Sequence, residues 1–274
     1  ADGFMIQGET GAGTTTTGNT FGASVEGLGD INGDGYDDIG IGAPATLPLH
    51  TGKAFVIFGG PNGQGSAVDV RQVLDVTTMT SSQGFSINGG NGWLGSAIGA
   101  AGDVNDDGLA DFIVSTPFAF SPSSGVSNGG ISYVIYGKDK TVQFGKTSGT
   151  NQSVLNVSQM GPADGFSIFG DGALDQLGRP YGDSSIVAPG DLNNDGIDDL
   201  YINNYQADSL GRTDNGMAVF VYGRTQTGNS NGSQGGVTRN GGSNAETING
   251  TDGRDFINGN GGADILRGFA GNDR

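Results

Sequence analysis

The clearest clue to the fold of this chain is the segment Asp30-Ile-Asn32-Gly-Asp34-Gly35-Tyr36-Asp37-Asp38. Its pattern recurs as Asp103-Val-Asn105-Asp106-Asp107-Gly108-Leu109-Ala-Asp111 and as Asp191-Leu-Asn193-Asn-Asp195-Gly196-Ile197-Asp198-Asp199. Each copy places carboxylate or amide oxygens at positions 1, 3, 5 and 9, and a glycine at position 6 permits a sharp turn. Oxygen donors in this arrangement suit calcium, a hard cation that takes about six to eight oxygen ligands.

The predicted side-chain ligands occupy the same four positions in each loop. They are Asp30, Asn32, Asp34 and Asp38 in the first, Asp103, Asn105, Asp107 and Asp111 in the second, and Asp191, Asn193, Asp195 and Asp199 in the third. One such loop could be a chance match in a chain rich in Asp and Gly. Three loops at corresponding places in internal repeats argue for a metal site in each.

Composition favours a β protein. Of the 274 residues, 55 are glycine and 34% are apolar. Glycine costs roughly 1 kcal/mol per helical position relative to alanine, so long helices are not expected. The apolar fraction suffices for a core of many short strands, and no apolar run reaches the length of a membrane-spanning helix.

The charge of the chain points to the same loops. The formal net charge is −17, which disfavours nucleic acid and anionic lipid as partners. Of the 29 acidic residues, 12 lie in the three loops, where a divalent cation would neutralise them. Cysteine is absent, so disulfides and thiolate metal sites are excluded. Calcium loops without disulfides predict a secreted bacterial protein, at the cell surface or in the extracellular medium.

The sequence repeats with a period of 81 residues, since Gly-Phe pairs begin at Gly3, Gly84 and Gly165. Within each repeat, short β-prone segments alternate with Gly/Asn/Asp turns. We expect strands at 21–25, 39–41 and 54–58, at 94–98, 112–114 and 132–136, and near 177–178, at 200–202 and at 218–222. With the Gly-Phe segment, each repeat supplies four strands, as in a propeller blade.

A different period follows the third repeat. Residues 224–240 lack apolar periodicity and predict a flexible linker. Beyond it, acidic residues and Ile or Leu recur every nine residues, the pattern of the calcium-binding β-roll nonapeptide. Asp255 and Asp264 are the predicted calcium ligands of this tail. We therefore predict that the chain divides into blades at 1–83, 84–164 and 165–223, the linker at 224–240, and an incomplete nonapeptide segment at 241–274.

The first 223 residues resemble the FG-GAP repeats of integrin-α-like β-propellers. Phe21-Gly22 and Gly42-Ala43-Pro44 carry both halves of that name, and the later repeats depart from it. The resemblance implies an all-β propeller whose loops bind calcium between two strands of a blade. It also implies that position 7 contributes a backbone carbonyl, here from Tyr36, Leu109 and Ile197. The tail resembles RTX nonapeptide arrays, so the combination is typical of large bacterial exoproteins, many of them adhesins.

Other motifs in the chain lack their usual context. An EF-hand needs Glu at position 12 of the loop and flanking helices, but the loops have Ile41, Val114 and Ile202 there. The Gly-x-Ser-x-Gly match around Ser127 has no histidine downstream, because the only histidine is His50. We expect Trp93 to pack within a blade. The evenly repeated sites predict a structural role and no enzymatic activity.

We expect an extracellular structural or adhesion module that calcium makes rigid, with a protein or glycan ligand or self-association as its possible partners. The alternatives are a subunit of a self-assembling surface layer or filament, and an accessory domain of a secreted hydrolase. Propellers have about four to eight blades, whereas three repeats are visible. The sequence is therefore expected to be an excerpt of a longer protein, to share blades with neighbouring copies, or to form an open stack.

Overall fold

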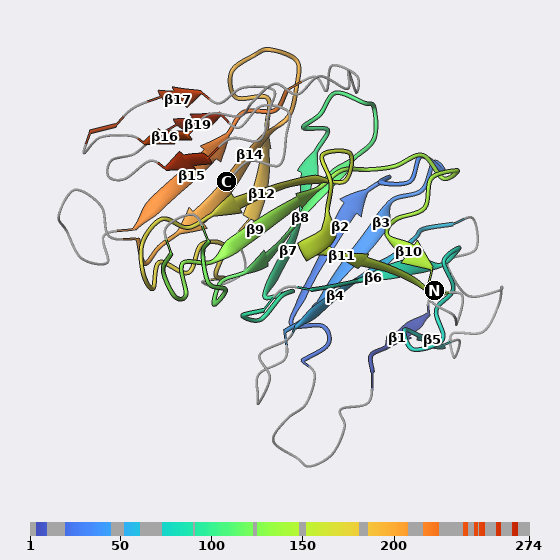
Figure 1. The fold of residues 1–274 in the computed structure, drawn as a ribbon. Helices are drawn as coiled ribbons and strands as arrows, with labels where there is room; N and C mark the ends of the chain where they lie inside the picture. The colour runs from blue at the N-terminus through green and yellow to red at the C-terminus, as the bar shows by residue number, and fades with distance from the viewer. Residues whose placement is uncertain are drawn as a thin grey trace.

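Three mainly antiparallel sheets stand side by side in this computed structural model, followed by a smaller C-terminal element (Figure 1). The structure describes residues 4–9, 20–44, 52–60, 73–89, 91–122, 125–147, 152–180, 186–207 and 216–224, and the short segments 238–240, 244–245, 247–249, 256–258 and 265–267. Within these residues the secondary structure is β, apart from the one-turn 3₁₀ helix η1 (Val157–Gln159). The prediction of an all-β fold with propeller-like blades is confirmed.

The main part of each sheet is a blade, whose first three strands follow one another in the chain. Blade 1 consists of β2 (Ser24–Gly29), β3 (Asp38–Ala43), β4 (Lys53–Ile57) and β6 (Gly84–Asn88). Blade 2 consists of β7 (Ala97–Gly102), β8 (Asp111–Thr116), β9 (Ile131–Ile135) and β12 (Gly165–Phe169). Blade 3 has β13 (Ile186–Gly190), β14 (Asp199–Asn204) and β15 (Met217–Val221). Each pair of neighbouring strands in these sets is antiparallel.

The sheets and the sequence repeats differ in phase. The Gly-Phe segments that open the second and third sequence repeats form β6 and β12, which are the outermost strands of blades 1 and 2. Blades 1 and 2 thus take their fourth strand from the beginning of the next repeat. The predicted boundaries at 83/84 and 164/165 therefore fall inside the sheets.

The innermost strand of each blade starts later than the sequence predicts. Positive φ angles of 86°, 85° and 72° occur at Gly22, Gly95 and Gly178. Because a β-strand needs a negative φ, the chain turns at these glycines and the strand begins after them. The strands expected at 21–25 and 94–98 begin instead at Ser24 and Ala97. The strand expected near 177–178 lies at 186–190.

The core lies between the blades because alternate residues of a strand point to opposite faces of its sheet. In β8, Phe112 and Val114 belong to the cluster shared with blade 1, whereas Ile113 belongs to the cluster shared with blade 3. All three are fully buried, which contributes roughly 1.5–3 kcal/mol for each side chain. A central blade therefore depends on neighbours on both of its faces.

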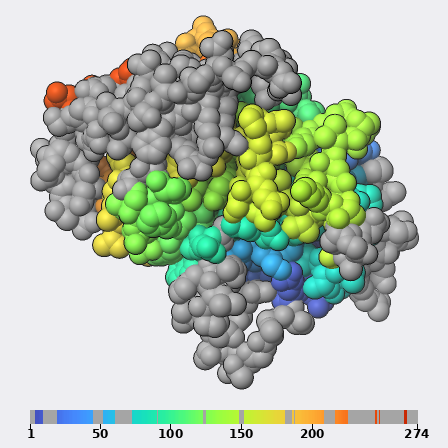
Figure 2. Space-filling view, viewed as in Figure 1, coloured from blue at the N-terminus to red at the C-terminus, as the bar shows by residue number. Residues whose placement is uncertain are grey.

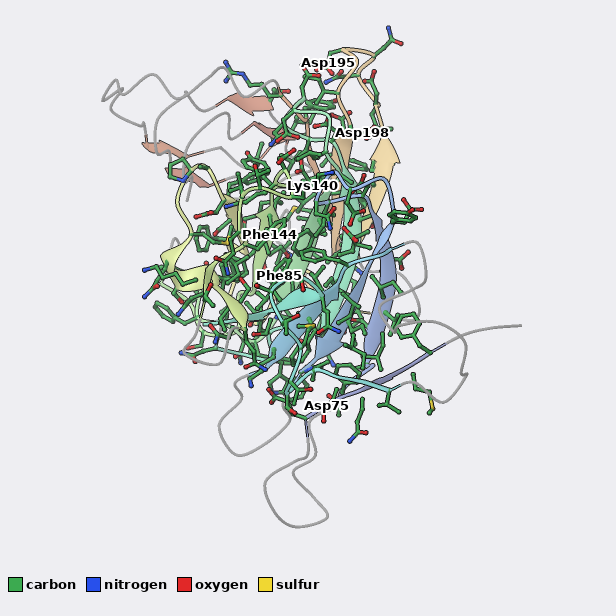
Figure 3. The ribbon with its side chains drawn as sticks, turned by 90° about the vertical axis from the view of Figure 1, so that its right-hand side faces the viewer. Asp75, Phe85, Lys140, Phe144, Asp195 and Asp198 are labelled. Atoms are coloured by element: carbon green, nitrogen blue, oxygen red, sulfur yellow. The ribbon has the colours of Figure 1, made fainter. Side chains whose placement is uncertain are left out.

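The segment that links β9 to β12 seals the outer edge of blade 1. Its strand β11 (Ser153–Asn156) pairs in parallel with β6, and β10 (Lys146–Thr147) pairs with β11. Phe144 of this segment stacks on Phe85 with ring centroids 4.4 Å apart (Figure 3). On the face in Figure 2, its yellow-green residues lie against the blue and cyan residues of blade 1.

The same parallel pairing occurs one repeat earlier, where β1 (Met5–Gln7) pairs with β5 (Val73–Asp75). Ile6 is opposite Leu74, and Ile87 is opposite Leu155. Both partners of the second pair lie 81 residues after those of the first, so the first two sequence repeats each pair their opening strand with a later strand of the same repeat.

The tail forms short parallel strands, β16 (Thr238–Asn240), β17 (Thr247–Asn249), β18 (Phe256–Asn258) and β19 (Ile265–Arg267). β16 pairs with β18, and β17 pairs with β19, so strands 18 residues apart are neighbours. One turn of this β-roll therefore comprises two nonapeptides. β19 also pairs with β15 at the outer edge of blade 3. The predicted linker 224–240 lies largely outside the described residues, and its last three residues form β16.

Candidate metal centres in the blade loops

The three predicted calcium loops occupy the same place in each blade. They connect β2 to β3, β7 to β8 and β13 to β14, so each loop joins the innermost strand to the second strand. Figure 3 shows Asp195 and Asp198 of the third loop at one end of the molecule, opposite Asp75. Strands flank every loop, and Ile41, Val114 and Ile202 at position 12 lie in β3, β8 and β14. This geometry excludes the EF-hand alternative.

The first loop is closed by hydrogen bonds from its backbone amides to its polar side chains. Asp30 Oδ1 accepts from the amides of Gly33 (2.7 Å) and Asp34 (3.1 Å), and Asp30 Oδ2 accepts from Gly35 (2.8 Å). Asn32 Oδ1 accepts from the Asp34 amide at 2.9 Å. The glycine at position 6 has a φ of 92°, which a residue with a Cβ rarely adopts.

The other two loops repeat this network. In the second, Asp103 accepts from the amides of Asp107 (3.1 Å) and Gly108 (2.8 Å). In the third, Asp191 accepts from Asp195 (3.1 Å) and Gly196 (2.8 Å). The amide Nδ2 at position 3 donates to the position 5 carboxylate in all three loops. The structure thus brings together positions 1, 3 and 5 in the same way three times.

The aspartate at position 9 has a second role that the sequence pattern does not reveal. Asp111 is fully buried, and its Oδ2 accepts from the Val104 amide inside the loop at 2.9 Å. Its Oδ1 accepts from the amide of Gly137, at the end of the third strand, at 2.8 Å. The carboxylate therefore ties the loop to a strand that is distant in sequence.

The equivalent bonds occur in blades 1 and 3. Asp38 accepts from Ile31 (3.0 Å) and Gly59 (2.7 Å), and Asp199 accepts from Leu192 (2.7 Å) and Gly223 (2.9 Å). The glycines two residues after the third strands, Gly59, Gly137 and Gly223, thus help to hold the loops. This role was not predicted from the sequence, although a glycine after the strand-like segment of every repeat was a signal for it. Each is packed against neighbouring backbone too closely for an added Cβ.

The loops concentrate negative charge in a partly dehydrated setting. Burial raises the pKa of Asp38 to about 7, two backbone amides lower it, and the carboxylates of Asp34 and Asp30 raise it again. In the second loop burial raises the pKa of Asp111 to about 8, with smaller increases from Asp107 and Asp103. Burial is therefore the main cause of both shifts and repulsion between carboxylates a smaller one, and a divalent cation at these loops would stabilise the charged form against both.

The donor chemistry of each loop fits calcium. Within the described residues no three acidic or histidine side chains converge as a metal cluster by themselves. In each loop, hydrogen bonds hold the carboxylates of positions 1 and 5 beside the amide oxygen of position 3, whereas the position 9 carboxylate is held by two backbone amides. Because a carboxylate oxygen has two lone pairs, these bonds leave capacity for a cation. Calcium accepts such mixed oxygen ligands in an irregular geometry, whereas magnesium demands a near-ideal octahedron.

The remaining predicted residues are placed as follows. Asp255 and Asp264 of the tail, and His50, lie outside the described residues. Trp93 packs against Phe118 with ring centroids 4.3 Å apart, as a blade-packing residue would. The backbone carbonyls of Tyr36, Leu109 and Ile197 remain predicted ligands.

A cavity of about 430 Å³ borders the first loop. Asn32 and Asp34 line one side, and aromatic side chains including Phe85 and Phe144 line another, together with Lys140 (Figure 3). The cavity combines apolar walls with polar groups, the composition usual for sites that take small ligands.

The fold and the loops define a class, the repetitive all-β proteins that bind calcium. The FG-GAP repeat model matches residues 21–68, 94–135 and 185–221, and the RTX calcium-binding nonapeptide repeat model, of four copies, matches 240–274. The chain therefore contains three FG-GAP repeats followed by RTX nonapeptides, and calcium is its cofactor.

Curated relatives include integrin α subunits. The chain is 36% identical to integrin alpha-IIb of Mus musculus over 95 residues, which are 34% of the chain and 8% of that protein. It is 32% identical to integrin alpha pat-2 of Caenorhabditis elegans over 176 residues, 61% of the chain and 13% of that protein. It is 28% identical to integrin alpha-8 of Mus musculus over 160 residues, 56% of the chain and 13% of that protein. The chain thus spans about a tenth of the length of these relatives.

Blade 3 contains a buried acidic group that the sequence pattern does not flag. Asp175 and Asn204 are 2% and 1% exposed, and within the described part of the chain Asp175 Oδ1 and both side-chain amide atoms of Asn204 make no hydrogen bond. Burial raises the pKa of Asp175, and the neighbouring Asp171 raises it further. The unfolded chain therefore releases this proton at lower pH than the folded chain does. The free energy of unfolding therefore falls as pH rises from the pKa of Asp175 in the unfolded chain to its higher pKa in the folded chain.

Replacing Asp175 with asparagine is expected to raise the melting temperature at pH 8 and to change it little at pH 4. The asparagine side chain carries no charge to bury. Its oxygen can still accept from the backbone N–H of Gly172, and its NH₂ group offers a donor to the side-chain oxygen of Asn204. We expect the free energy of unfolding to increase by roughly 1–3 kcal/mol at pH 8. Thermal unfolding at both pH values measures it, and an equal change at the two values would contradict the role of the charge.

Proposed function

We propose that this chain is a calcium-rigidified structural module of an extracellular protein, with adhesion as its biological role. The single observation that carries the proposal is the threefold repetition of one oxygen-lined loop, each tied by its position 9 aspartate to the third strand of its blade. A cation bound in such a loop stabilises a whole sheet and not only a turn.

Several features support the extracellular setting. RTX nonapeptides and FG-GAP repeats are calcium-dependent elements, and free calcium is abundant outside cells. Extracellular calcium modules bind with dissociation constants of about 10⁻⁴–10⁻³ M, so the blades would become rigid after export. Among the described residues no helix is long and apolar enough to cross a membrane. A secreted bacterial origin and a protein or glycan ligand are parts of this proposal.

An enzymatic role receives no comparable support. Catalysis needs one differentiated site, whereas the three loops share the same hydrogen-bond network. Ser127 lies between β8 and β9, and its carbonyl accepts from the Leu174 amide. We therefore propose a non-enzymatic module, with service as an accessory domain of a secreted hydrolase as the second candidate.

The variant Asp34→Ala tests the metal role. It removes a predicted ligand whose other partners are only the Tyr36 amide and the Asn32 side chain at a half-exposed position. We expect the substitution to lower the free energy of unfolding by about 1.4 kcal/mol at a calcium concentration ten times the dissociation constant, and to leave it nearly unchanged in chelator. Chemical unfolding in the two conditions measures the difference.

The charge control is Asp106→Asn, which removes one negative charge from the second loop at an exposed position outside the ligand set. We expect its stability to respond to calcium as that of the parent chain does. If Asp34→Ala and Asp106→Asn behave alike in calcium, the first loop holds no metal at position 5.

A further inference from the structure

Successive blades are joined by a contact that repeats along the molecule. Between blades 1 and 2, the position 1 carbonyl of Asp30 accepts from the position 8 amide of Ala110 at 3.2 Å. The position 2 carbonyl of Ile31 accepts from the amide of Lys138, the residue after the third-strand glycine, at 2.9 Å. The side chain of Ile31 is fully buried at this contact.

The contact between blades 2 and 3 uses the same positions. The carbonyl of Asp103 accepts from the Asp198 amide at 3.2 Å, and the carbonyl of Val104 accepts from the Arg224 amide at 2.7 Å. Val104 is 5% exposed. A third bond is added here, because the Asp198 carboxylate accepts from the Asp103 amide at 3.0 Å.

The outer face of blade 3 presents the same groups without a partner. Leu192 corresponds to Ile31 and Val104, yet it is 51% exposed. The carbonyls of Asp191 and Leu192 accept no hydrogen bond within the described residues. Gly190 faces open space, whereas the equivalent Gly102 lies against Asp198 of the next loop.

The opposite face of blade 1 presents the complementary groups. Ile98 of β7 is 6% exposed and packs on Gly40 of blade 1, whereas the corresponding Val25 of β2 is 58% exposed. The amides of Asp37 and Gly60 occupy the positions of Ala110 and Lys138, and neither donates a hydrogen bond within the part of the chain described.

The residue at position 8 makes blade 1 resemble blade 3 more closely as a partner in this contact. Blade 1 carries Asp37 there, as blade 3 carries Asp198, whereas blade 2 carries Ala110. A blade 1 docked on blade 3 would thus reproduce all three hydrogen bonds of the contact between blades 2 and 3, with Leu192 and Val25 covered.

We propose that blade 3 of one copy of this chain binds blade 1 of a second copy, head to tail, through the contact that joins the blades within the chain. The two faces are different, so the interface is heterologous and closes into a ring or extends into a filament. Two copies bring six blades together, within the range of about four to eight found in closed propellers.

Two variants that each disable one face test the proposal, with light scattering after size-exclusion chromatography in saturating calcium. Leu192→Asp places a charge on the blade 3 face, and Val25→Asp places one on the blade 1 face. Val142→Asp is the matched control, since Val142 is 52% exposed and belongs to neither face. Thermal unfolding of each variant confirms that it is folded.

We expect the parent chain and Val142→Asp to reach at least twice the single-chain mass of 27.6 kDa at about 0.1 mM, a range in which weak specific contacts form. Each face variant alone is expected to keep the single-chain mass. An equimolar mixture of the two face variants should recover the mass of two chains, because each supplies the face that the other lacks.

Two results would overturn the proposal. One is a parent chain that keeps the single-chain mass up to about 1 mM, in which case these faces are reserved for other blades. The other is loss of assembly in Leu192→Asp but not in Val25→Asp, which indicates a symmetric contact between two blade 3 faces. The proposed calcium role is judged separately, because Asp34→Ala is compared by unfolding in calcium and in chelator.

Discussion

Asp111→Ala is expected to lower the free energy of unfolding by roughly 2–6 kcal/mol, both in calcium and in chelator. The change leaves the buried amides of Val104 and Gly137 without acceptors, and each unsatisfied amide costs about 1–3 kcal/mol. These bonds do not require metal, so most of the loss persists after calcium is removed. Urea unfolding in both conditions provides the measurement.

Asp106→Asn is a suitable control for this prediction. Asp106 lies in the same loop, is exposed, and has a φ of 59°, which asparagine tolerates. We expect a change of about 0.5 kcal/mol or less, as for most surface substitutions. A loss confined to calcium in Asp111→Ala would show that position 9 serves only as a metal ligand.

Removal of calcium is expected to lower the free energy of unfolding by about 4 kcal/mol through the three blade loops together. Each loop contributes about 1.4 kcal/mol at a calcium concentration ten times its dissociation constant, if calcium does not bind the unfolded chain. This is a large part of the roughly 5–15 kcal/mol that stabilises a typical domain. Unfolding curves recorded with calcium and with chelator compare the two states.

Magnesium at the same concentration provides the control for calcium removal. Its strict octahedral geometry and reluctance to lose water make the irregular loop a poor site, so it should restore little of the stability. Identical curves in calcium and in chelator would contradict the metal role of the loops.

Local chemistry made much of the fold predictable. A β-branched or aromatic run such as residues 54–58 specifies a strand by itself, and the pattern of aspartates around a glycine specifies a turn. The period of 81 residues identified the repeating unit, and the nonapeptide period identified the roll of the tail. The convergence of positions 1, 3 and 5 could be predicted for the same reason, because loop geometry depends on neighbours in sequence.

The phase of the blades could not be read from the chain. The Gly-Phe strands β6 and β12 belong to the sheets of the preceding blades because they pair with β4 and β9. Pairing between strands that are distant in sequence leaves no local signal in the chain. The start of the innermost strand was mispredicted because Gly95 takes a left-handed φ, while its apolar neighbours read as a strand.

The all-β class, the number of visible repeats, the three oxygen-rich loops and the nonapeptide tail follow from residue type and spacing alone. The hydrogen bonds from the position 9 aspartates to residues distant in sequence had to come from the three-dimensional arrangement, as did the exposure of Leu192 and Val25 where Ile31 and Ile98 are buried. Burial and long-range hydrogen bonds depend on which blade lies alongside, whereas a local pattern is the same whether or not that neighbour is present.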